Sequence, residues 1–88
     1  MPLKDSVEAL DEAVGSFLAG DARDNKAILA AVFGVNNEIG RLLRPTGDPA
    51  LKALQRNVNE VTKAAKRNDR RALARSTEKV RAEALRIA

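Results

Sequence analysis

Apolar side chains recur at alternating steps of three and four residues along four stretches of this chain. That spacing places side chains on one face of an α-helix, whereas a half-buried strand repeats every two residues. The four stripes are Leu3, Val7, Leu10, Val14 and Phe17; Ile28, Val32, Val35, Ile39 and Leu42; Leu51, Leu54, Val58, Val61 and Ala65; and Leu73, Thr77, Val80, Ala84 and Ile87. The pattern predicts an all-α protein, a small bundle or hairpin array of three to four amphipathic helices.

Turn-forming residues between the stripes set the expected helix boundaries within a single helical domain. The expected helices span approximately residues 4–19, 22–44, 49–67 and 70–87 of a domain covering residues 1–88. Gly20 suits the left-handed position after a helix, and Asp21 suits the N-cap of the next one. Pro45 is expected to end the second helix, because proline has no backbone donor. Asp48 and Pro49 suit the N-cap and first position of the third helix.

The junction between the last two predicted helices contains neither glycine nor proline. Residues 66–71 are Lys-Arg-Asn-Asp-Arg-Arg, in which Asn68 or Asp69 suits an N-cap. Leu51 and Leu73 are separated by 22 residues, or two 11-residue units, so they would also share a face of one straight helix. We expect a break at this junction. The alternative is one continuous helix of about 39 residues, roughly 58 Å long.

The apolar stripes define a small predicted core. Its candidate core or interface residues are Val32, Val35, Ile39, Leu51, Leu54 and Val58. Residues 27–35 are apolar on all sides, which predicts a central, widely covered helix. The chain has 88 residues, and sixteen of them are alanine, so the core is modest and the isolated monomer is expected to be marginally stable. Association with a partner or with further copies would relieve that shortfall, and we expect an oligomer.

Charge is divided unevenly between the two halves of the chain. Residues 1–40 carry three basic and seven acidic side chains, whereas residues 41–88 carry thirteen basic and five acidic ones. Such a chain can fold one half onto the other, meet the opposite charge of a neighbour, or offer its basic half to a polyanion. The candidate interaction residues in the basic half are Arg67, Arg70, Arg71, Arg75 and Lys79.

The composition argues against most catalytic and metal chemistry. The sequence contains no cysteine and no histidine, which removes thiolate chemistry, the commonest transition-metal ligand and the usual general base. None of the serine or threonine hydroxyls has a base at hand, and there is no glycine-rich phosphate loop. We therefore expect no enzyme activity, no catalytic residue, no cofactor and no metal site.

Two non-catalytic functions remain open from the sequence. The first is a small helical interaction or assembly protein that acts through protein–protein contacts, either with itself or with a specific partner. The alternative is a nucleic-acid- or polyanion-binding module that uses the basic C-terminal half. The sequence lacks the apolar run of a signal peptide and the roughly 20 apolar residues of a membrane span, so we expect no membrane span and a cytoplasmic location.

Overall fold

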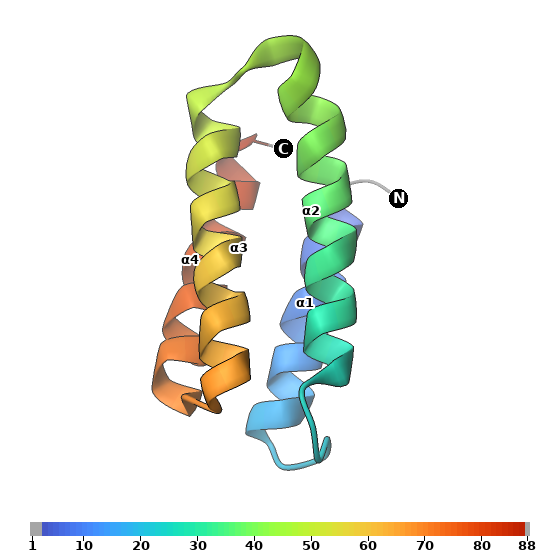
Figure 1. Ribbon diagram of the computed structural model, residues 1–88, viewed down its shortest axis with the longest axis vertical. Helices are drawn as coiled ribbons and strands as arrows, with labels where there is room; N and C mark the ends of the chain where they lie inside the picture. The colour runs from blue at the N-terminus through green and yellow to red at the C-terminus, as the bar shows by residue number, and fades with distance from the viewer. Residues whose placement is uncertain (1–2, 88) are drawn as a thin grey trace.

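The computed structural model describes residues 3–87 and consists of four antiparallel α-helices (Figure 1). They are α1 (Leu3–Leu18), α2 (Lys26–Thr46), α3 (Pro49–Arg67) and α4 (Arg70–Ile87). Each helix contains one of the four apolar stripes, and the stripe is the face that it buries, except that Leu42 of α2 is exposed and Ile87 of α4 is only partly buried. The prediction of a small all-α bundle is confirmed.

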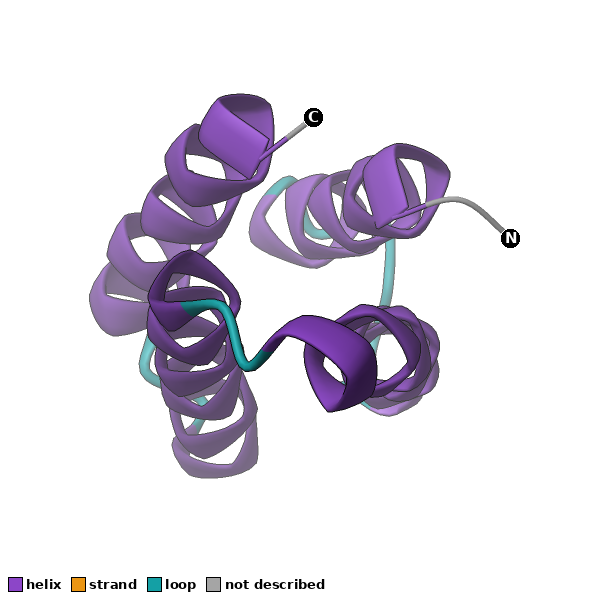
Figure 2. Cartoon of the chain, turned by 90° about the horizontal axis from the view of Figure 1, so that it is seen from above, coloured by secondary structure: helices purple, strands orange, loops and turns teal. Residues whose placement is uncertain are grey.

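The helices occupy the corners of a square in chain order, as Figure 2 shows from one end of the bundle. α1 packs against α2 and α4, and α3 packs against the same two neighbours. Within residues 3–87, the backbones of α1 and α3 do not approach each other closely, and neither do those of α2 and α4. Each helix therefore has two neighbours, one buried stripe and an outer face that points away from the diagonal helix.

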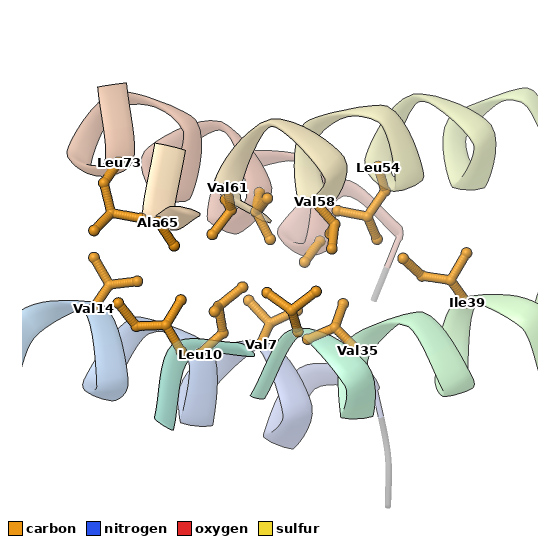
Figure 3. Packing of buried hydrophobic residues seen from close by; sticks show 14 of the residues in the cluster. Val7, Leu10, Val14, Val35, Ile39, Leu54, Val58, Val61, Ala65 and Leu73 are labelled. Carbon is orange, nitrogen blue, oxygen red and sulfur yellow. The ribbon is translucent and has the colours of Figure 1, made fainter. Parts of the chain in front are cut away.

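The core lies between the α1–α2 pair and the α3–α4 pair, where side chains from all four helices point toward one another (Figure 3). Leu10, Ile39, Leu54 and Leu73 are each completely shielded from solvent, one from each helix. Burial of a side chain of this kind stabilises the fold by about 1.5–3 kcal/mol. The six candidate core or interface residues all lie in this core: Val32, Val35, Ile39, Leu51, Leu54 and Val58.

Helix α2 is less covered than its composition predicts. Phe33 is 68% exposed and Leu42 is 41% exposed, and the neighbouring Ala27 and Ala30 are also exposed. The expectation of a central, widely covered helix is therefore wrong. The reason is the square arrangement, in which α2 has only α1 and α3 as neighbours and its outer face stays in solvent.

The connection between α1 and α2 is longer than predicted. α1 ends at Leu18, and Gly20 adopts the left-handed conformation that was expected there, with φ of 86°. Asp21 does not cap α2, which begins at Lys26 instead of residue 22. The N-cap residue is Asn25, whose side chain makes no capping hydrogen bond, and the Lys26 backbone N–H donates instead to Asp24 Oδ1 at 3.1 Å. Residues 21–25, which are polar apart from Ala22, thus belong to the loop that joins the two antiparallel helices.

Helix α2 also continues two residues past its predicted end. Pro45 lies inside its last turn, and the helix ends at Thr46. Gly47 sets the end, since it adopts the left-handed conformation and donates its N–H to the carbonyl of Leu43 at 2.7 Å. Proline removes a backbone donor and its ring crowds the preceding turn, and α2 continues only one residue past Pro45 before Gly47 ends it. α3 begins as expected, with Asp48 accepting from the Ala50 N–H and Pro49 in the first turn.

A turn separates α3 from α4 at Asn68 and Asp69, as the favoured alternative required. Asn68 is left-handed, with φ of 54°, and donates its N–H to the carbonyls of Ala64 and Ala65. Asparagine is one of the few residues that tolerates this conformation. Asp69 then caps α4, because its Oδ1 accepts from the Ala72 N–H at 3.1 Å. Asn68 and Asp69 thus end one helix and begin the next in a junction that has no glycine or proline.

Candidate interaction surface

Exposed cations cover the outer faces of α3 and α4. Seven of them form no ion pair within residues 3–87, and we call this group the basic surface: Lys52, Arg56, Lys66, Arg67, Arg71, Arg75 and Lys79. Four of the five candidate interaction residues belong to it. Acidic side chains lie among these cations, and Glu60 pairs with Lys63 at 3.6 Å and Glu83 with Arg86 at 3.9 Å. The surface is therefore mixed in sign but strongly positive overall.

A shallow groove runs between α3 and α4 within the basic surface. Its lining residues are Asn57 and Glu60 from α3 and Ala72, Arg75, Ser76 and Lys79 from α4. Small residues on α4 form part of it, and Arg75 and Lys79 contribute the charge. The packing of α3 on α4 thus brings cations from one helix beside polar side chains from the other, which the sequence alone did not place together.

Arg70, the fifth candidate, is engaged within the molecule. Its Nη2 donates to the carbonyl of Phe17 at 3.4 Å and also to the carbonyl of Leu18, at the C-terminal end of α1. Its guanidinium lies over the Phe17 ring, with Cζ 5.4 Å from the ring centroid. The last turn of α1 has no basic residue of its own, so Arg70 supplies the cation that the C-terminal end of a helix favours. Arg70 therefore stabilises the bundle.

Asn25 makes a second contact of this kind at the same end of the bundle. Its Nδ2 donates to the carbonyl of Ala65, in the last turn of α3, at 3.0 Å. Asn25 precedes α2, so the bond joins the loop between α1 and α2 to the end of α3. Both long-range contacts are made to carbonyls in the last turn of a helix, where Phe17 also accepts from the Gly20 N–H and Ala65 from the Asn68 N–H of the following turn.

Replacing Arg70 by alanine is expected to lower the free energy of unfolding by about 1 kcal/mol. The change removes a cation at a helix C-terminus and a cation–π contact, each worth roughly 0.3–1 kcal/mol. The adjacent Arg71 is exposed and unpaired within residues 3–87, so R71A is the matched control and should stay within about 0.5 kcal/mol of the original protein. Urea unfolding followed by circular dichroism measures both. Equal losses in the two variants would contradict the role assigned to Arg70.

The outer face of α1 has the opposite charge. Asp5, Glu8 and Glu12 are exposed there and form no ion pair within the described part of the chain, and we call them the acidic face. Asp11 differs, because it pairs with Arg81 of α4 across the helix interface at 3.8 Å. Asp11 and Arg81 are both about half exposed, so this ion pair lies at the edge of the α1–α4 interface, while most of the charge of α1 and α4 in the described part of the chain remains on separate outer faces.

A hollow lies beside the acidic face, between α1 and α4. Its lining residues are Lys4, Val7, Glu8, Asp11, Arg81, Ala84 and Leu85. Leu85 is 70% exposed, whereas five of the ten leucines of the chain are buried. The sequence contained a signal for this, since Leu85 falls outside the stripe that runs through Val80, Ala84 and Ile87. The hollow combines an apolar wall with carboxylates and cations at its edges.

The geometry gives little support to other kinds of site. Over residues 3–87, no group of three or more carboxylates gathers closely enough to hold a metal ion. None of the four helices is sufficiently long and apolar to cross a membrane. The main chemical feature of the described surface is therefore the separation of charge between α1 and the α3–α4 pair.

Comparison with known proteins adds no assignment. The chain matches no family model, no curated protein and no solved structure.

Proposed function

We propose that this chain is a small non-enzymatic interaction protein, whose basic surface on α3 and α4 binds an acidic surface of a protein partner. The observation that supports the proposal is the set of seven exposed cations without an acidic partner in the bundle. An attraction of this kind guides two proteins together and selects their orientation.

The character of the basic surface favours a protein over a nucleic acid. Glu60 lies in the groove with Arg75 and Lys79, and Glu78 and Glu83 lie on α4. A phosphate backbone would be repelled by these carboxylates, whereas a protein surface of mixed charge can pair with both signs. The chain has no tyrosine, tryptophan or histidine, and its two phenylalanines are on α1 and α2, so no aromatic side chain on this surface can stack on a base.

Polyanion binding is the second candidate, and one observation supports it. Arg71 and Arg75 lie four residues apart on α4, and Arg67 ends α3 on the other side of the turn, so exposed cations stand on both helices at this end of the α3–α4 pair. Arrays of this kind bind phosphate groups with an affinity that decreases steeply as salt is added.

The test compares two probes of similar charge by fluorescence anisotropy at low salt: a labelled peptide of about 20 residues rich in glutamate, and a labelled DNA duplex. We expect the peptide to bind more tightly than the duplex, and the double variant R71E/R75E to weaken peptide binding at least about tenfold. The matched control is R41E/R44E, which changes the charge by the same amount near the C-terminal end of α2. That control should bind the peptide nearly as the original protein does.

Three results would contradict the proposal. They are the absence of peptide binding at low salt, equal losses in R71E/R75E and R41E/R44E, and tighter binding of the duplex than of the peptide. The last result would establish the polyanion alternative instead.

A further inference from the structure

We infer that the acidic partner of the basic surface is the acidic face of α1 on a second copy of this chain. The inference rests on the proposed function, because it names the partner of the same surface. Asp5, Glu8 and Glu12 supply the negative charge, and none of them is paired within residues 3–87. Each copy therefore carries both halves of a complementary contact.

The bundle geometry keeps most of the basic surface away from the acidic face of the same copy. α4 is a neighbour of α1, but Arg70 lies beside Phe17 and Arg81 beside Asp11, so the antiparallel register holds Arg71 and Arg75 toward the far end of α1 from Asp5 and Glu8. α1 and α3 lie at diagonal corners, so the acidic face and the α3 part of the basic surface point in opposite directions (Figure 2). The ion pair described between α1 and α4 within residues 3–87 is Asp11–Arg81. The remaining charges of both surfaces are left to a neighbour.

The same geometry determines the type of assembly. When the acidic face of one copy binds the basic surface of the next, the two contact surfaces are different, and each end of the pair still presents an unused surface. Such head-to-tail contacts produce rings if the rotation closes and open filaments if it does not. A two-fold dimer would have to bury the acidic face and the basic surface of both copies in one interface, whereas α1 and α3 lie at diagonal corners of the bundle.

The hollow between α1 and α4 offers a place for an incoming cation. Val7, Ala84 and Leu85 provide apolar contacts for the aliphatic stem of an arginine or lysine, and Glu8 provides a carboxylate for its charged end. Asp11 already pairs with Arg81, which also lines this hollow, so Glu8 is the carboxylate left for an incoming cation. An arginine of the basic surface, such as Arg71 or Arg75, is long and exposed enough to enter.

The test uses two double variants in which the charge of exposed residues is reversed. E8K/E12K reverses charges of the acidic face, and R71E/R75E reverses charges of the basic surface. Light scattering at an ionic strength of about 0.01 M, where the Debye length is about 30 Å, measures the mass against concentration. We expect the original chain to exceed the mass of two copies as its concentration rises, and each variant alone to lose this behaviour. A mixture of the two variants should recover it, because every contact between unlike copies is again complementary.

The control variant R41E/R44E should assemble as the original chain does, and circular dichroism should show unchanged helicity in all variants. The inference is overturned if the original chain remains a monomer, if either double variant assembles normally, or if the mixture does not recover. Should the chain remain a monomer and yet bind the glutamate-rich peptide through Arg71 and Arg75, the proposed function stands and only the identity of the partner is wrong. Failure of peptide binding as well would overturn both.

Discussion

Substituting Leu54 by alanine will lower the free energy of unfolding by about 3 kcal/mol, which is a large part of the stability available to a domain of this size. Leu54 is completely shielded from solvent in α3, and its side chain points into the core between the two helix pairs (Figure 3). Removing a buried leucine side chain costs about 2–5 kcal/mol, because the apolar contacts are lost and the cavity closes only in part. Small domains have roughly 5–15 kcal/mol in total.

Leu85 provides the matched control for this substitution. It carries the same side chain on α4 but is 70% exposed, so L85A should change the unfolding free energy by less than about 0.5 kcal/mol. Thermal unfolding should show that L54A lowers the midpoint temperature by more than about 10 °C, since 1 kcal/mol corresponds to about 4–8 °C in a domain of this length. Similar shifts in the two variants would mean that the core is not built as described.

Removing a buried hydroxyl group should have the opposite effect and stabilise the protein. Thr77 of α4 is 4% exposed, and its Oγ1 has no hydrogen-bond partner. A buried polar group without a partner costs about 1–3 kcal/mol, and valine has nearly the same shape as threonine. We therefore expect T77V to raise the free energy of unfolding by about 1 kcal/mol. Ser6 of α1 is in the same situation at 2% exposure, so S6A should act in the same direction.

Ser76 is the control for these two hydroxyls. It is also buried, but its Oγ donates to the carbonyl of Ala72 at 2.7 Å. The variant S76A should lose rather than gain stability, by about 0.5–1 kcal/mol, because a satisfied hydrogen bond disappears. Urea unfolding measures the free energy of unfolding of T77V, S6A and S76A. A loss of stability in T77V comparable to that of S76A would contradict the assignment of Thr77 as an unsatisfied group.

The periodicity of apolar residues predicted the helices well because each helix buries a single stripe. Even Thr77 was placed on the inward face of α4 from its spacing to Leu73 and Val80, and it is buried there. The start of α2 was wrong because residues 21–25 contain suitable caps at more than one position. Which one is used depends on the path from α1 and on the bond from Asn25 to Ala65, 40 residues away. No local pattern contains that information.

The candidate interaction residues likewise include some whose position followed from the sequence and one whose role did not. Arg67, Arg71, Arg75 and Lys79 lie exposed on the α3–α4 pair, and their spacing was enough to place them. Arg70 is adjacent in sequence, but its partners are the carbonyls of Phe17 and Leu18, more than 50 residues away. Its role therefore depends on the packing of α1 against α4. The exposure of Phe33 likewise follows from the number of neighbours of α2, which its composition does not determine.

The most direct test of the central claim, that the basic surface is a protein-contact surface, is a map of binding on the protein itself. Backbone amide resonances of the isotopically labelled chain would be followed while the glutamate-rich peptide is added at low salt. The account predicts that the largest changes occur on the outer faces of α3 and α4, around Arg71, Arg75 and Lys79, and disappear at about 1 M salt, where the Debye length is about 3 Å. Changes that centre on the exposed Phe33 of α2 and persist at high salt would contradict it.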